Sequence, residues 1–189
     1  MDVFEYVAVL TSIIIGLSMA HVLRGLTQFI QQPKQSGLFF AHIFWAIYMF
    51  LMTIFWWWWE FQLATMPTWT FGIYLYVILY AVLIFVLCSL LFPESLTGFD
   101  GYKGYFLAKR TWFFAVFMLM NAIDFGDTLL KGMDYLYSLG IEYPVSIGTQ
   151  LVLSIIAITT RNEKFHNTFA AALVAYLFLQ AFRFYGTAG

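Results

Sequence analysis

The stretch that decides the fold is residues 38–61, "LFFAHIFWAIYMFLMTIFWWWWEF". Glu60 is its only charged residue, and the run is long enough for a membrane-spanning helix, which needs about 20 mostly apolar residues. Composition extends the argument to the whole chain. Only 10% of the 189 residues are charged and 62% are hydrophobic, whereas about 25% of the residues in an ordinary soluble domain are charged. Lipid must therefore cover much of the surface, and the sequence predicts an all-α integral membrane protein.

The rest of the chain predicts a compact bundle of about six transmembrane helices with short loops, forming a single domain over residues 1–189. The first apolar run has no small-x-small cleavage site and is expected to be an uncleaved span. The fourth span is harder to place, because the apolar run 111–123 is too short unless the helix includes neighbouring charged residues. The predicted helices are residues 3–29, 38–61, 69–92, 108–130, 143–160 and 165–184.

Positive charges predict the orientation of this bundle, because cytoplasmic loops are enriched in Lys and Arg. With six helices, one side of the membrane receives most of the basic residues. These are Arg24, Lys34, Lys103, Lys109, Arg110, Arg161 and Lys164. The other side keeps Lys131 and Arg183. Both termini are therefore predicted to lie outside, which in a bacterium means a cytoplasmic (inner) membrane protein with periplasmic termini.

Four consecutive tryptophans end the second predicted helix, and helical geometry divides them. At 100° per residue, Trp56, Trp57 and Glu60 fall on one inward stripe, whereas Trp58 and Trp59 point away. The run is interpreted as an aromatic belt at the membrane surface, where an indole ring is favoured because its N–H can reach water. The alternative is a cation-binding mouth made of the inward three residues, because indole faces beside a carboxylate suit an ammonium ion.

The fourth predicted helix supplies the candidates for handling an ion or a proton. Asn121 and Asp124 share one face, and the spacing of Asp127 and Lys131 favours an ion pair. If the helix enters near Thr111, Asp124 lies about 20 Å deep in a hydrocarbon core of about 30 Å. A carboxylate at that depth must be neutralised or must meet a cation.

This helix also admits a structural interpretation, in which Asp124 caps a helix break at Gly126 or pairs with Lys131 or Arg183 near the surface. In the functional interpretation, Glu60 stands at the mouth of a polar path that leads to Asp124. Both interpretations place an ionisable group at or inside the membrane edge.

Rows of small or polar residues at four-residue spacing predict packing seams between helices. The rows are Ser12, Gly16 and Ala20; Ser146, Gln150 and Ser154; and Asn167, Ala171 and Ala175. The second row has an alternative interpretation, in which it lines a polar path together with Asn121 and Asp124.

The three histidines, His21, His42 and His166, are expected near the cytoplasmic face. We interpret them as hydrogen-bonded residues at the membrane interface. Imidazoles that converge from separate helices can also hold a metal ion or a haem, and a pH-sensing or proton-relay role is a further alternative. The spacing alone cannot show convergence, and the chain has no HExxH motif and only one cysteine, Cys88.

Three functions remain compatible with these residues. The first is an ion, proton or small-molecule channel or transporter with a polar bundle interior. The second is a haem- or metal-binding membrane subunit, and the third is a non-catalytic subunit of a homo-oligomer or larger membrane complex. An enzyme is disfavoured because no catalytic motif is found. The expected partner is the lipid bilayer and not nucleic acid, because the net charge of −1 offers no basic surface.

Overall fold

The computed structural model describes residues 3–31, 39–66 and 68–185. This part of the chain forms seven α-helices, of which six are long and apolar enough to cross a membrane. The six are α1 (Val3–Gln31), α3 (Phe40–Glu60), α4 (Phe71–Leu91), α5 (Gly101–Leu130), α7 (Glu142–Thr159) and α8 (Glu163–Tyr185). A short 3₁₀ helix, η1 (Phe61–Thr65), continues α3, and α6 (Met133–Ser138) joins α5 to α7. The predicted all-helical, multi-pass architecture is confirmed.

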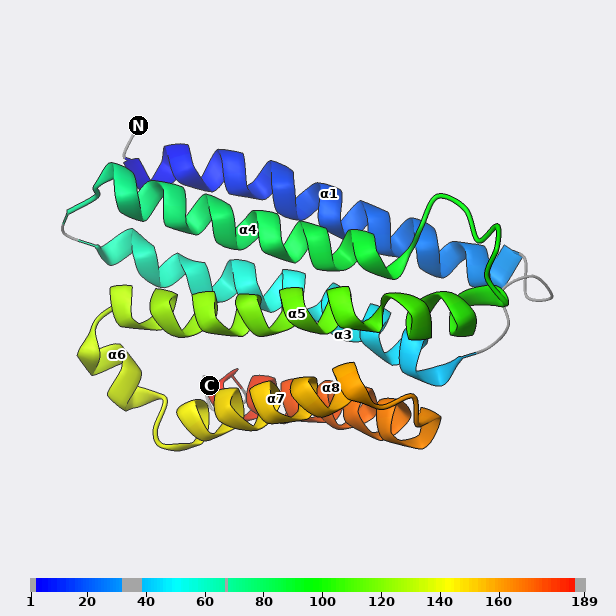
Figure 1. Cartoon of the computed structure of the whole chain (residues 1–189). Coiled ribbons are helices and arrows are strands. Elements are labelled where there is room, and N and C mark those ends of the chain that lie inside the picture. The colour runs from blue at the N-terminus through cyan, green and yellow to red at the C-terminus, as the bar shows by residue number, and fades with distance from the viewer. Residues whose placement is uncertain (1–2, 32–38, 67, 186–189) are drawn as a thin grey trace.

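The six long helices run side by side along one axis (Figure 1). α1 and α4 pack together on one side, α3 and α5 occupy the middle, and α7 and α8 lie on the opposite side. α3 packs mainly against α8, while α5 packs against α7 and α4. By contrast, the backbones of α3 and α5 come close at few points, as do those of α7 and α8. The pairs α3–α8 and α5–α7 therefore face each other across the interior.

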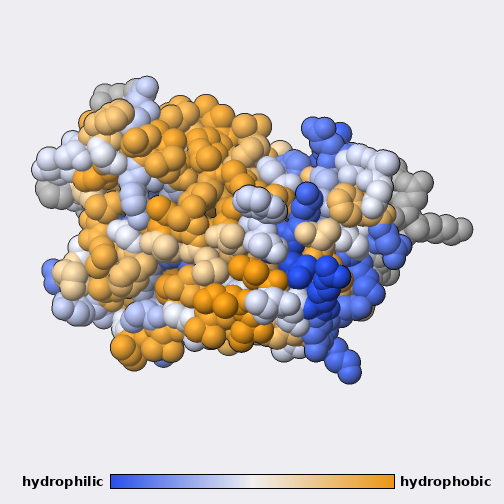
Figure 2. All heavy atoms as spheres, in the orientation of Figure 1, coloured by the Kyte–Doolittle hydropathy of each residue, from blue (hydrophilic) through white to orange (hydrophobic). Residues whose placement is uncertain are grey.

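The two ends of the bundle differ in charge. At the acidic end, where α3 and α5 finish, the acidic residues are Glu5, Glu60, Asp124, Asp127, Asp134 and Glu142. At the basic end, where α5 and α8 begin, the basic residues are Arg24, Lys103, Lys109, Arg110, Arg161 and Lys164. Figure 2 shows the most hydrophilic residues gathered at one end and a hydrophobic surface over most of the remainder. Lys34 and the side chain of Arg183 lie outside the described part, and the membrane side that each end faces stays a prediction.

An aromatic cluster fills the middle of the bundle toward the basic end. The ring of Trp45 packs nearly perpendicular to four phenylalanine rings, with centroid distances of 4.9 to 5.5 Å. These four are Phe113, Phe114, Phe117 and Phe169. All five rings are buried, and edge-to-face contacts of this kind add about 0.5–1.5 kcal/mol each beyond the burial of area. The cluster joins α3, α5 and α8.

α5 begins at Gly101, earlier than the predicted start at residue 108. Its first turns carry Lys103 and other basic residues, which lower the local hydropathy, yet Tyr102, Tyr105 and Phe106 are buried. The Tyr105 hydroxyl donates to the Leu90 carbonyl at 3.0 Å. The inward aromatic face therefore continues into the segment that hydropathy assigns to a loop.

The seam predicted on α1 is wrong. Ser12, Gly16 and Ala20 lie on the exposed side of the helix, and a Cβ added at Gly16 would meet no described atom within 4 Å. The close approach occurs at Gly25, where an added Cβ would lie 2.2 Å from the ring of Phe92. The small residue that allows close packing on α1 is therefore Gly25, which lies beyond the end of the predicted row.

The row on α8 meets α3 at Asn167. Its side-chain Oδ1 accepts a hydrogen bond from the backbone N–H of Ala41 at 2.8 Å. Ala41 lies in the first turn of α3, where backbone N–H groups have no partner within the helix. Ala171 is half-buried and Ala175 is exposed. The row therefore contacts a neighbouring helix at Asn167 and faces away from the interior at Ala175.

Candidate functional site

A cavity of about 280 Å³ lies between α3, α5, α7 and α8 in the acidic half of the bundle. It occupies the space between the facing pairs α3–α8 and α5–α7. Its polar lining includes Glu60, Asn121, Asp124, Thr128, Gln150 and Gln180. The volume is close to the lower limit of about 300 Å³ for small-molecule sites.

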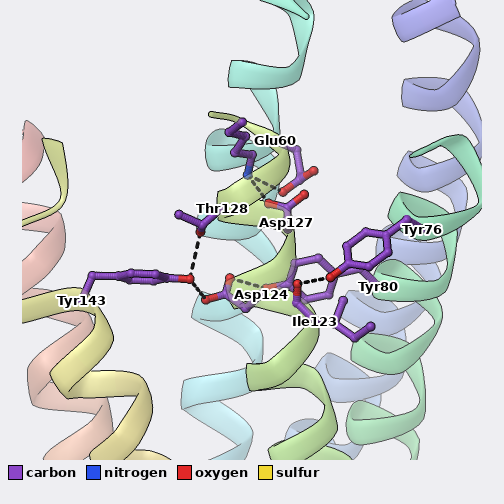
Figure 3. A network of polar contacts seen from close by, with 9 residues as sticks. Glu60, Tyr76, Tyr80, Ile123, Asp124, Asp127, Thr128 and Tyr143 are labelled. Carbon is purple, nitrogen blue, oxygen red and sulfur yellow. Dashed lines mark hydrogen bonds and ion pairs between the residues drawn. The ribbon is translucent and has the colours of Figure 1, made fainter. Parts of the chain in front are cut away.

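Asp124 of α5 is the polar centre of this cavity (Figure 3). The Tyr80 hydroxyl of α4 donates to its Oδ1 at 2.7 Å, and the Tyr143 hydroxyl of α7 donates to its Oδ2 at 2.8 Å. Thr128 in turn donates its hydroxyl to the oxygen of Tyr143 at 2.8 Å. Both carboxyl oxygens therefore accept from neutral donors, which is the pattern of an ionised carboxylate.

The ion pairs of the described residues do not include Asp124. Its predicted pairing with Lys131 is therefore wrong, and the side chain of Arg183 lies outside the described residues. The predicted helix break at Gly126 is also wrong, because α5 continues to Leu130. The missing side chain of Gly126 instead leaves room for the hydroxyl of Tyr76 against α5. The Tyr76 hydroxyl donates to the Ile123 carbonyl at 2.6 Å, and a Cβ at Gly126 would lie 2.1 Å from that hydroxyl.

Lys131 joins two buried carboxylates near the cavity (Figure 3). Its Nζ lies 2.5 Å from Asp127 Oδ2 and 2.8 Å from Glu60 Oε1. The three side chains are only 4%, 1% and 4% exposed, respectively. Burial alone would lower the pKa of Lys131, but the two carboxylates outweigh burial and hold that pKa above its usual value. The predicted Asp127–Lys131 pair is confirmed, and Glu60 joins it.

The tryptophan run meets the cavity as predicted at Trp56 but not at Trp57. Trp56 is 1% exposed and packs edge-on against Tyr80, with ring centroids 5.5 Å apart. Trp57 is 40% exposed, so its predicted inward position is wrong. Trp59 and the largely exposed Trp58 line the cavity instead. For Trp59 the reason is geometric: Trp56, Trp59 and Glu60 have the i, i+3, i+4 spacing of one helix face, whereas Trp57 is turned about 100° from it.

The three histidines are not brought together. His21 and His166 each hydrogen-bond a backbone carbonyl, at 3.0 and 3.1 Å. His42 is fully buried, and neither of its ring nitrogens has a hydrogen-bond partner among the residues that the structure describes. The ring of Phe92 contacts both His21 and His42, and that of Phe106 contacts both His42 and His166. Across the described ranges, no group of three His, Cys, Asp or Glu side chains is placed to hold a metal ion.

Two partners of Asp124, Tyr80 and Tyr143, were missed by the sequence reasoning. Tyr80 lies in the apolar run of α4, where hydropathy gives no sign of a polar contact. The available signal is the spacing of Tyr76 and Tyr80, which places two hydroxyls on one face of a membrane helix. Both hydroxyls reach α5. Tyr143 stands at the start of α7, where it resembles an ordinary interfacial tyrosine.

The cavity ends against the aromatic cluster. Tyr48 lines the cavity, and its ring lies 5.5 Å from that of Trp45 and 6.0 Å from that of Phe117. The arrangement offers a buried carboxylate, neutral hydrogen-bonding groups and aromatic walls, which suit the binding of a proton, a cation or a small polar solute. Compared with known proteins, the chain matches no protein family, no curated protein and no solved structure.

Proposed function

We propose that this protein moves a proton or a small solute across a membrane, using the cavity at the acidic end and Asp124 as the group that takes up charge. The observation that carries the proposal is the setting of Asp124. Its carboxylate lines a cavity inside a bundle of membrane-spanning length, and its two oxygens are held by neutral hydroxyls.

A carboxylate in this setting favours the uptake of positive charge. Ionised groups are costly in a low-dielectric interior unless they are paired, and neutral hydrogen bonds reduce that cost only in part. A proton or a cation that reaches Asp124 from the cavity therefore removes an uncompensated charge. Tyr80 and Tyr143 fix the position of the carboxylate in advance, which favours a binding site over a flexible surface group.

The ion cluster of Glu60, Asp127 and Lys131 supports a role at the entrance. Glu60 and Lys131 line the same cavity as Asp124 and come from the ends of α3 and α5. If the basic end faces the cytoplasm, as the positive charges predict, this entrance opens on the outer side of the membrane. Entry of protons or cations from that side is what the membrane potential of a bacterium would drive.

The test is proton movement into liposomes that contain the purified protein and a pH-sensitive dye. With a potassium diffusion potential that is negative inside, wild-type liposomes should acidify faster than empty ones. Asp124→Asn keeps the size of the side chain but removes its ionisable group, so acidification should fall to the rate of empty liposomes. Asp134→Asn removes an exposed carboxylate at the same end of the molecule and should leave the rate unchanged.

The proposal is rejected if Asp124→Asn liposomes acidify at the wild-type rate, or if wild-type liposomes acidify no faster than empty ones. Tyr143→Phe provides a second variant that keeps the carboxylate. It removes one of the two hydroxyls that hold Asp124, so its rate should lie between those of wild type and Asp124→Asn. Equal unfolding temperatures of the variants separate lost function from lost fold.

A further inference from the structure

We propose that the solute bound in the cavity is an organic ammonium ion, a charged amine attached to an apolar body. This inference rests on the proposed function, because it names the class of solute for the same site. It is carried by three properties of the cavity: its charge, its excess of hydrogen-bond acceptors, and the size and chemistry of its walls.

The charge around the cavity favours a cation. Three carboxylates, those of Glu60, Asp124 and Asp127, stand near a single described ammonium group, that of Lys131. Lys131 is already engaged by two of them, at 2.5 and 2.8 Å. Asp124 is left with two neutral hydroxyl donors. An anionic solute would therefore be repelled, whereas a cation would complete the charge balance of the site.

The cavity also presents more acceptors than donors. Among the described residues, three buried oxygens of the cavity lining have no hydrogen-bond partner: Glu60 Oε2 from α3, Gln150 Oε1 from α7 and Gln180 Oε1 from α8. Gln150 is only 8% exposed, and its amide nitrogen already donates to Ser146 Oγ at 3.1 Å. The matching unpartnered donor on the lining is the Trp56 indole N–H. A primary ammonium carries three N–H donors and no acceptor, which is the complement of this surface.

Lys131 shows how this end of the bundle holds an alkylammonium. Its Nζ sits between two carboxylates and lies 5.8 Å from the ring centroid of Tyr135, a cation–π distance. Asp124 lies two turns earlier in the chain than Lys131 and offers the deeper carboxylate. Its site also has aromatic neighbours on the lining, Trp56 and Tyr143. The solute would repeat the bonding of Lys131 at a carboxylate that lacks an ammonium partner of its own.

The size and the walls of the cavity indicate an apolar body on the cation. About 280 Å³ is far more than the roughly 10–15 Å³ that one water-sized occupant needs, so a bare inorganic ion would leave the cavity unfilled. Much of the wall is apolar, with Met52, Met120, Ile147 and Leu177 contributed by all four helices. A multivalent metal ion is disfavoured, since the described acidic side chains do not converge as a metal-binding group.

Three probes of similar shape and different charge test this inference: benzylammonium, benzyl alcohol and benzoate. Binding is measured at pH 7 on the full-length protein in lipid nanodiscs, by calorimetry and by quenching of tryptophan fluorescence, because Trp56 and Trp59 line the cavity. Benzylammonium should bind saturably and at least about tenfold more tightly than benzyl alcohol, which has no charge to pair with Asp124. Benzoate should show no saturable binding.

Two variants assign the binding to the cavity. Asp124→Asn should weaken benzylammonium binding by about tenfold or more, and the matched control Asp134→Asn should leave it unchanged. Gln150→Leu removes one of the free acceptors without altering charge and should weaken binding several-fold.

The inference is overturned if benzylammonium binds no better than benzyl alcohol, or if it binds equally well to wild type and to both cavity variants. Such a result together with Asp124-dependent acidification of liposomes would leave the proposed function standing with a different solute. If acidification is also independent of Asp124, both proposals fail.

Discussion

Lys131 is a single side chain that joins the end of α3 to the end of α5. Its Nζ bonds Glu60 at the end of α3 and Asp127 in α5. Toward the basic end, the same two helices meet through Trp45 and the phenylalanine rings of α5. The ion cluster therefore closes the bundle beside the cavity at the acidic end. A buried ion pair is not by itself strongly stabilising, but removing one partner leaves the others buried without compensation.

Replacing Lys131 should show this cost. We expect Lys131→Met to lower the free energy of unfolding by about 3–5 kcal/mol at pH 7, because it leaves the carboxylates of Glu60 and Asp127 buried without their cation. Unfolding can be followed with a thiol-reactive dye, since Cys88 is buried and is the only cysteine.

Lys103→Met is the matched control for that experiment. It breaks the Lys103–Glu163 pair, whose side chains are 46% and 49% exposed, and should change stability by less than about 1 kcal/mol. Equal effects of Lys103→Met and Lys131→Met would contradict the role given to the buried cluster.

Only part of this residue-scale chemistry is predictable from sequence. The Asp127–Lys131 pair follows from helical spacing, because both partners lie on one helix. Glu60 and Tyr80 reach the site from other helices, and periodicity carries no information about which helix lies opposite. The error at Trp57 has another origin: the predicted stripe was drawn too wide, so it took in a residue about 100° from the centre of the buried face.

At the scale of elements, α3 depends on α8 for its beginning. Phe39 precedes α3 and provides no side-chain cap, and the Asn167 side chain from α8 supplies an acceptor to the N–H of Ala41. A polar group from a neighbouring helix thus takes the place of the usual N-cap residue.

Asn167→Ala should therefore destabilise the protein by about 0.5–2 kcal/mol, the usual cost of losing a helix cap. Asn167→Asp keeps an acceptor oxygen and adds a negative charge near the positive end of the α3 dipole, so it should retain most of the stability. The same Cys88 labelling experiment measures both variants. An Asn167→Ala protein that unfolds at the wild-type temperature would contradict the capping role.

The element boundaries show what hydropathy detects and what it misses. The end of the second predicted helix, at residue 61, agrees with the end of α3 at Glu60, where the α-helix passes into the 3₁₀ helix η1. The start of α5 was placed seven residues late, since Lys103, Lys109 and Arg110 lower the average hydropathy while Tyr102 and Phe106 still pack inward. Packing, rather than average hydropathy, decides where that helix begins.

For the whole molecule, apolar runs predict the number of long helices but not their neighbours. The sequence indicates part of the buried face of α3, through Trp56 and Glu60, but it misplaces the packed face of α1. It does not say that α3 pairs with α8 and α5 with α7, and the cavity is a consequence of those pairings. Gln150 and Gln180 could therefore be proposed as the lining of a polar path, but which helices enclose that path could not be predicted.

The orientation of the whole molecule can be tested with cysteines at opposite ends. In a Cys88→Ala background, Ser138→Cys places a thiol at the acidic end and Ser95→Cys places one at the basic end, and both positions are exposed. A membrane-impermeant maleimide should label Ser138→Cys in cells with a permeable outer membrane, and Ser95→Cys only after the inner membrane is opened. The reverse pattern would place the acidic end in the cytoplasm.

The aromatic cluster beyond the cavity has a consequence for speed. Tyr48 lines the cavity together with Asp124, and its ring packs against those of Trp45 and Phe117. Buried rings of this kind are close-packed. In the proposed transport, onward passage would require several large rings to change rotamer together, an event limited by an activation barrier and not by diffusion. Such a molecule would work as a slow, saturable carrier whose turnover rises steeply with temperature, with the bulk of Trp45 setting its rate.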